Sequence, residues 1–180
     1  LKIYEKALGP DNAELANLVN NLGAFAVARG DYATAEQFYM RALAIYEKAL
    51  GPDHPDVAAC LNNLGLLHIS QGDYVKAEPL CRRALAISEK ALGPDHPDVA
   101  MCLKSLAMLQ SRGGDYPAAV SAYETATTLS PRDYRMWRNL AAGYDKAPGR
   151  QDRAAEAYRK ALDLAEQERE LDPTDGSVDI

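Results

Sequence analysis

Apolar residues recur along the chain with the spacing of α-helices. Between residues 61 and 69 they fall at i, i+3, i+6 and i+8, and between residues 77 and 85 at i, i+4, i+7 and i+8: Leu61, Leu64, Leu67 and Ile69, then Ala77, Cys81, Ala84 and Leu85. Each set lies along one face of a helix with 3.6 residues per turn. The pattern therefore predicts two amphipathic helices joined by a turn at Gly72-Asp73.

The ends of these helices are marked by residues that favour helix termini. The second helix is expected to end at Leu92, where Gly93 can adopt a left-handed C-cap conformation. The next helix is expected to begin at Pro97, with Asp98 favourably placed near the positive end of the helix dipole. Pro79 lies about one turn inside the second helix, where it should remove one hydrogen bond or bend the helix.

The same helix pair is repeated along the chain. The twelve residues EKALGPDHPDVA occupy positions 47–58 and recur unchanged at 89–100, and the first seven also occupy positions 5–11. These segments are 42 residues apart, as are the two NNLG segments at 20–23 and 62–65. After residue 106 the period shortens to 34 residues. A period of this length predicts an array of stacked helix pairs, in which each pair covers the apolar face of the next.

Small and aromatic residues at fixed places connect this array with a known family. The fourth unit carries, in order, Trp137, Leu140, Ala141, Tyr144, Ala154, Tyr158 and Ala161. This order resembles the tetratricopeptide repeat (TPR), and the 42-residue form of the earlier units is similar to the repeats of kinesin light chains. The resemblance implies an all-α fold, a right-handed superhelical solenoid of antiparallel helix pairs. The residues of the second helices, Tyr158 included, are expected to form a packed stripe.

The resemblance also implies a division of the chain into repeats. We expect repeats at residues 16–49, 58–91, 100–133 and 134–168. Residues 1–8 then correspond to the orphan second helix of a preceding repeat, and residues 169–180 form an acidic tail, so the chain is expected to be a piece of a larger protein. The chain carries a net charge of −6, and residues 163–180 alone contain seven acids and one arginine. We expect that end to be a solvated tail, or a mimic of an acidic ligand.

Composition and motifs argue against catalysis, cofactors and membranes. No phosphate-binding loop, zinc-protease motif or hydrolase elbow is present, so no catalytic residue, metal site or cofactor is predicted. His54 and His96 repeat in equivalent linkers, which favours a capping role over metal binding, and His68 and the pair Cys60 and Cys102 are interpreted as packing residues. The acidic balance argues against a nucleic-acid partner, and no apolar run approaches the length of a membrane span. The expected location is the cytoplasm.

The binding surface is expected on the first helix of each repeat. In the TPR family these helices line a concave groove that holds a peptide, and the positions that face it share one helical stripe. The candidate peptide-binding residues are Asn20, Asn21, Asn62, Asn63, Leu66, Lys104, Met108, Arg112, Arg135, Arg138, Asn139 and Lys146. Amides can bond to a peptide backbone, and Arg and Lys can bind carboxylates. The Asn residues have an equally weighted structural alternative, in which they bond to a neighbouring helix.

These residues predict a non-catalytic protein-protein interaction module. Its partner would be a peptide that combines an apolar or aromatic residue with acidic residues, because the candidate residues are apolar and amide in the first two repeats and mainly cationic in the last two. One alternative is a structural spacer, or an array that self-associates through its exposed ends, with no peptide ligand. A further alternative is a regulatory domain of a larger multidomain protein.

Overall fold

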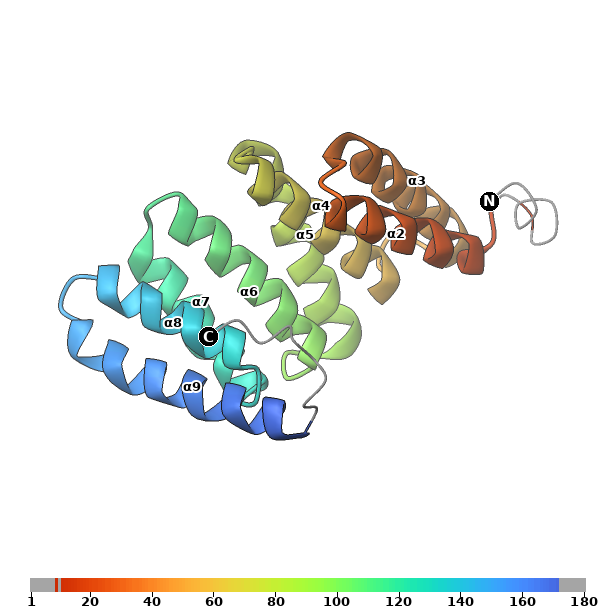
Figure 1. Ribbon diagram of the computed structural model, residues 1–180. Helices are drawn as coiled ribbons and strands as arrows, with labels where there is room; N and C mark the ends of the chain where they lie inside the picture. Colours follow the sequence, from red (N-terminus) through yellow and green to blue (C-terminus); the bar gives the residue numbers. More distant parts are fainter. Residues whose placement is uncertain (1–8, 10, 172–180) are drawn as a thin grey trace. The chain divides into compact units, whose positions relative to one another are not determined.

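The computed structural model describes residues 9 and 11–171, and within this part of the chain every regular element is helical (Figure 1). Residues 1–8 and 172–180, which include the expected orphan helix and most of the expected acidic tail, lie outside the described residues. The helices are α2 (Ala13–Ala28), α3 (Tyr32–Leu50), α4 (Pro55–Gln71), α5 (Tyr74–Leu92), α6 (Pro97–Arg112), α7 (Tyr116–Leu129), α8 (Tyr134–Lys146) and α9 (Ala154–Leu171), with a 3₁₀ turn, η1 (Gln151–Arg153). The all-α prediction is confirmed.

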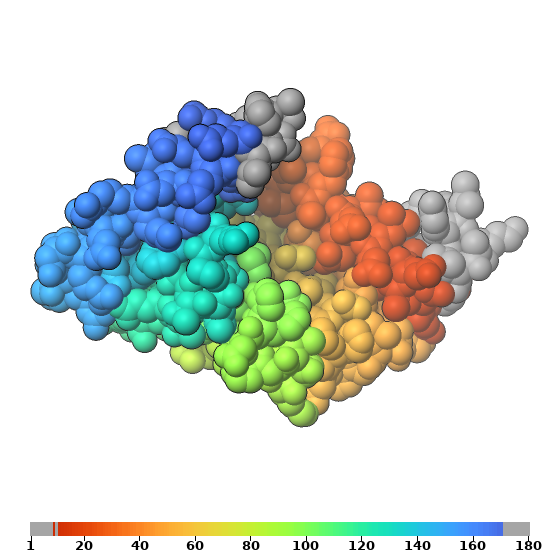
Figure 2. All heavy atoms as spheres, turned by 90° about the horizontal axis from the view of Figure 1, so that it is seen from below, coloured from red at the N-terminus to blue at the C-terminus, as the bar shows by residue number. Residues whose placement is uncertain are grey.

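The chain divides into two compact units, Leu1–Ser105 and Leu106–Ile180. In the first unit α2 packs against α3 and α4 packs against α5, and α3 also contacts α4. In the second unit α8 packs against both α7 and α9, and Figure 2 shows the cyan to blue atoms of this unit packed together. Helix α6 begins in the first unit and ends in the second. Each unit is a stack of antiparallel helices with its own core.

The repeated linkers produce repeated helix caps. The side chains of Asp31, Asp73 and Asp115 each accept a hydrogen bond from a backbone N–H in the first turn of α3, α5 and α7, respectively. His54 and His96 cap α4 and α6 in the same way, because each Nδ1 accepts from the backbone N–H two residues later at 3.2 Å. The predicted capping role of the two histidines is therefore confirmed.

The predicted bounds of the helices hold around the second linker, with one difference in cap geometry. Helix α5 ends at Leu92 and α6 begins at Pro97, as predicted. The left-handed cap, however, is found at Gly72, with φ 78° and ψ 8°, and not at Gly93, where φ is 87° and ψ is 158°. The chain turns tightly back after α4 but extends into the linker after α5, so the two glycines take different conformations, both favoured by the absence of a Cβ atom.

Small residues in the first helices bring the paired helices of the first unit close together. A Cβ atom on Gly23 would lie 2.7 Å from Tyr39 Cε1, and one on Gly65 would lie 2.6 Å from Cys81 Sγ. Both partner side chains are buried. The missing Cβ at Gly23 and Gly65 therefore sets the distance between α2 and α3 and between α4 and α5.

The stripe of small and aromatic residues on the second helices is buried until the last described helix. Tyr39, Cys81 and Tyr123 are at most 4% exposed, but Tyr158 is 41% exposed. The prediction that Tyr158 is packed is wrong because no helix among the described residues follows α9 and covers that face. The Tyr158 hydroxyl instead donates to Asp145 Oδ2 at 3.1 Å.

The three cysteines are free and buried. Cys60 Sγ lies 3.3 Å from the Tyr39 carbonyl oxygen, and Cys102 Sγ lies 3.6 Å from Ser88 Oγ. Burial raises the pKa of Cys60 to about 12 and that of Cys81 to about 11. Thiols that remain protonated at neutral pH are poor nucleophiles, which agrees with their predicted role in packing.

Candidate functional site

Two of the four amides predicted to bind a peptide in the first unit are hydrogen-bonded to each other across neighbouring helices. The Asn63 side chain on α4 donates to Asn20 Oδ1 on α2 at 3.2 Å, which joins two successive first helices. The adjacent Asn17 accepts a hydrogen bond from the Tyr46 hydroxyl on α3. These contacts correspond to the structural alternative for Asn20 and Asn63. Asn21, on the same helix, is exposed.

Asn62 is buried, with 6% of its surface exposed, and among the described residues its Oδ1 accepts no hydrogen bond. The repeat explains this. Asn20 is bonded to Asn63, and the pair one period later is Asn62 and Ser105. The shorter Ser105 side chain donates within its own helix, to the Met101 carbonyl oxygen at 3.1 Å. The change from Asn to Ser therefore removes the donor that Asn62 would otherwise meet.

The other candidate residues of the first unit are half-buried. Leu66 lies on α4 and Lys104 on α6, and both are partly accessible to solvent. The predicted residues from Asn20 to Lys104 lie in the first unit, and those from Met108 to Lys146 lie in the second.

The cations predicted in the second unit are exposed, which sets them apart from the amides. Arg135, Arg138 and Lys146 advance by three and eight residues along α8, so they occupy one side of that helix, and Arg112 ends α6. The Arg135 guanidinium lies over the Tyr134 ring at 5.4 Å, and its Nε donates to the Tyr134 hydroxyl at 3.3 Å, which raises the pKa of Arg135. These contacts hold Arg135 in place while it stays charged.

Other candidate residues of the second unit contribute to packing. Lys146 Nζ lies 5.4 Å from the centre of the Tyr116 ring, and Met108 is half-buried against the core of the second unit. The half-buried Asn139 lies close enough to the Tyr123 hydroxyl to affect its pKa. Burial raises the pKa of Tyr123, although Asn139 and the nearby Arg112 both act to lower it.

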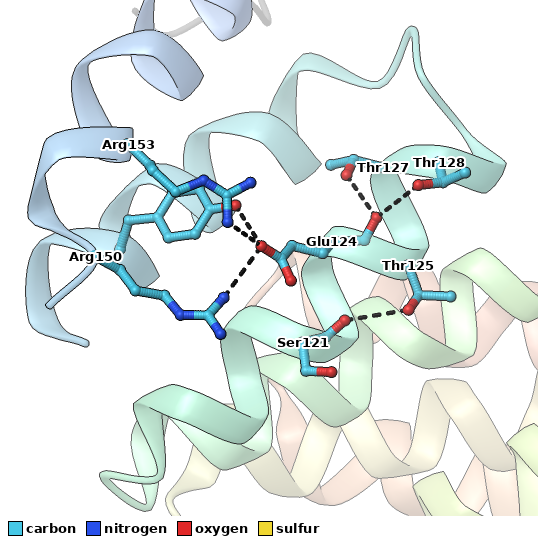
Figure 3. A network of polar contacts seen from close by, with 8 residues as sticks. Ser121, Glu124, Thr125, Thr127, Thr128, Arg150 and Arg153 are labelled. Atoms are coloured by element: carbon cyan, nitrogen blue, oxygen red, sulfur yellow. Dashed lines mark hydrogen bonds and ion pairs between the residues drawn. The ribbon is translucent and has the colours of Figure 1, made fainter. Parts of the chain in front are cut away.

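One polar network of the second unit was not predicted from the sequence. Glu124 on α7 accepts hydrogen bonds at the same oxygen, Oε1, from the Tyr144 hydroxyl at 2.6 Å, from Arg153 at 2.7 Å and from Arg150 at 3.2 Å (Figure 3). The Arg153 guanidinium also lies 4.6 Å from the centre of the Tyr144 ring. Burial raises the pKa of Glu124, but the hydrogen bonds from Tyr144 and Arg153 outweigh burial, and the net pKa is lowered. The network fixes the turn between α8 and α9 to α7.

Over the part of the chain that the structure describes, no three His, Cys, Asp or Glu side chains come together in a way that could hold a metal ion. Within the same residues, no helix has the length and apolar character needed to cross a bilayer.

Three solved structures share the fold of this chain, all at low sequence identity. BtubC (BKLC) from P. vanneervenii aligns with a TM-score of 0.66 and 22% identity, over 87% of this chain and 62% of BtubC, so the chain spans about three fifths of that protein. A Podosopora anserina putative kinesin light chain with nearly identical TPR-like repeats aligns with a TM-score of 0.72 and 21% identity, over 93% of this chain and 83% of the other. MamA aligns with a TM-score of 0.66 and 20% identity, over 94% and 86%.

Sequence comparison gives the family. No curated protein matches the chain. Family models described as tetratricopeptide repeat match residues 14–80, 62–132 and 105–169, which together cover most of the chain. The helix pairs, the small residues at their contacts and these matches agree, and the chain belongs to the tetratricopeptide repeat family.

Proposed function

We propose that this protein binds an acidic segment of a partner protein through the cationic surface of its second unit, Arg112, Arg135, Arg138 and Lys146. Repeats of this family are generally protein-protein interaction modules and are typically non-catalytic. The observation that carries the proposal is the exposure of four cations on the first helices α6 and α8, and the sequence of α8 contains one acid, Asp145. That acid already accepts a hydrogen bond from Tyr158.

The chemistry of these side chains favours carboxylates. Guanidinium groups donate paired hydrogen bonds to a carboxylate, and such charge-assisted bonds are stronger than neutral ones. Arg135 also borders a cavity of about 840 Å³ between the start of α8 and α9. Two further cations, Arg132 and Lys160, and two acids, Asp133 and Glu168, line the same cavity. The half-buried Met108 offers a contact for an apolar or aromatic residue of the same peptide.

The proposal is tested by titrating the whole chain with a panel of peptides that pair one aromatic residue with three or four acidic residues. We expect Arg135→Ala with Arg138→Ala to weaken binding by about tenfold or more, because each substitution removes a charge-assisted contact. Arg82→Ala is the matched control, since Arg82 is an exposed arginine of the first unit that is paired with Glu78 at 2.9 Å. Equal binding by all three proteins would refute the proposal.

A second function, self-association, is favoured by one observation. Tyr158 and Leu162 are each 41% exposed on α9, so this helix presents apolar side chains to solvent. Light scattering over a range of concentrations tests this alternative. If Tyr158→Ser with Leu162→Ser abolishes a concentration-dependent oligomer that the parent protein forms, the array associates with itself through α9.

A further inference from the structure

A groove in the first unit lies on other surfaces of the helices than the predicted peptide stripe. It is lined by α3, α4 and α5 and encloses about 610 Å³. Its apolar lining includes Met40 and Leu43 from α3, Leu64 from α4, and Val75, Pro79 and Leu80 from α5. We call this the α3–α5 groove. Leu64 is buried at its base, and none of the candidate peptide-binding residues lines it.

The α3–α5 groove exposes an unusual amount of apolar surface. Met40 is 57% exposed and Val75 is 86% exposed, although both border a cavity whose other walls are mostly apolar. Val75 takes this exposed place on a helix whose opposite face carries the buried Ala77, Cys81 and Ala84. A groove of this kind gains free energy when an apolar side chain from another molecule enters it.

The polar groups of the groove are mainly hydrogen-bond acceptors. His68 is 4% exposed, and among the described residues its Nδ1 has no hydrogen-bond partner. Its Nε2 lies 3.7 Å from Glu36 Oε1, which is too long for a hydrogen bond. Pro79 has no N–H group, so the carbonyl of Val75 lacks the donor that an α-helix normally supplies four residues later.

The charged groups that line the groove leave an acidic side chain available. Glu47 accepts a hydrogen bond from Arg83 at 2.7 Å, and Lys76 is paired with Asp73 at 2.9 Å. Glu36 has its nearest ion-pair contact at His68, at 3.7 Å, and lies near enough to Lys76 to add to the effect of Asp73, which raises the pKa of that lysine. The complement of such a groove is a donor with positive charge, beside an apolar group.

We propose that the α3–α5 groove binds a segment of a partner protein in which a Lys or Arg lies next to a large apolar side chain. The apolar side chain contacts Met40, Val75 and Leu64. The cation donates to the Glu36 carboxylate, whose contact with His68 is too long for a hydrogen bond. This site is separate from the proposed acidic-peptide surface, so either can fail without the other.

The test uses a displayed library of random 12-residue peptides, selected on the full chain and counter-selected on Val75→Lys. This substitution adds a positive charge and removes apolar surface at a position that is 86% exposed, so the fold should be retained. The selected peptides are expected to carry Lys or Arg beside Leu, Ile, Met or an aromatic residue. Met40→Lys should weaken the binding of the best peptide by about tenfold or more, as should Glu in place of its basic residue.

Phe25→Lys is the matched control. Phe25 is a large apolar residue of the first unit with 60% exposure, similar to Met40, but it lies on α2 and does not line the groove. It should leave peptide binding unchanged. Three results would overturn the proposal: no enriched motif, an enriched motif that is acidic, or binding that is equally sensitive to the substitutions at Met40 and Phe25. A change of oligomeric state on Met40→Lys would also overturn it, because the occupant would then be a second copy of the chain.

Discussion

Asn62 gives the sharpest prediction for stability, because it is a buried amide whose oxygen has lost its partner. Its side chain is 6% exposed, and among the described residues Oδ1 accepts no hydrogen bond. Leu has the same number of side-chain heavy atoms in nearly the same shape. Asn62→Leu therefore replaces an unsatisfied acceptor by an apolar group with the same branching, although its two methyl groups are bulkier than the amide, and we expect the protein to become more stable.

The size of the effect follows from opposing contributions. Leaving a buried acceptor unpaired costs about 1–3 kcal/mol, and that cost disappears in the variant. Burying the additional apolar surface adds about 1 kcal/mol, while the loss of the Asn62 Nδ2 group removes up to about 1.5 kcal/mol. The net expectation is an increase of about 1 kcal/mol in the free energy of unfolding, which corresponds to about 2–4 °C in Tm for a chain of this length.

The matched control is the neighbouring asparagine. Asn63→Leu makes the same chemical change one residue later, but Asn63 donates to Asn20 Oδ1 at 3.2 Å, so this variant breaks a bond and leaves Asn20 unpaired. It should lose about 1 kcal/mol. Urea unfolding followed by circular dichroism at 222 nm measures both. If Asn62→Leu loses as much stability as Asn63→Leu, the Asn62 oxygen is satisfied in solution and the reasoning is wrong.

Three further predictions concern packing and charge. Gly65→Ala should lower the free energy of unfolding by about 1–2 kcal/mol, since its Cβ would lie 2.6 Å from Cys81 Sγ, and Cys81→Ala in the same chain should recover part of the loss in urea unfolding. Glu124→Gln should destabilise the second unit by about 1–2 kcal/mol, read from the fluorescence of the single tryptophan, Trp137, because it weakens the bonds from Tyr144 and the two arginines. Because the folded pKa of Glu124 is lowered, its contribution is present above the ordinary pKa and is lost as the pH falls below about 4.5. The Glu124→Gln protein should therefore lose less stability than the parent protein between pH 4.5 and pH 3, and equal losses would contradict this assignment.

The repeated part of the fold was predictable from the sequence because it depends on local rules. Gly, Pro and Asp residues determine helix ends through effects that act within one turn. The starts of α4 and α6, and the capping of both helices by histidine, were therefore predictable from the repeated linkers. The close approach of α4 and α5 at Gly65 was also accessible in kind, since a small residue of each first helix precedes an alanine of the second helix by 12 residues in three repeats and by 13 in the fourth.

The candidate site was less predictable, because side-chain contacts between repeats depend on both partners at once. Asn62 and Asn20 hold equivalent positions on the predicted stripe, yet only Asn20 accepts a hydrogen bond. Position 105, which would supply the donor to Asn62, holds Ser instead of Asn. The Glu124 network depends on Arg150 and Arg153 in a turn that occurs once in the chain, so no periodic signal marks it. Pro79, which was predicted to remove a hydrogen bond or bend its helix, was the one sequence signal in the segments that line the α3–α5 groove.

The nearly identical linkers show where specificity in this array must come from. Identical segments give identical caps, as at His54 and His96, and such positions cannot distinguish one repeat from another. Other equivalent positions carry different residues in successive repeats. His68 and Gln110 are one period apart, and each has a buried polar atom with no partner among the described residues. Leaving such atoms unpaired costs stability, and the cost differs from repeat to repeat with the side chain that carries it. Recognition by this protein should therefore concentrate at the departures from the repeat, such as Met40 and Val75, which correspond to Arg82 and Ala33 one period away.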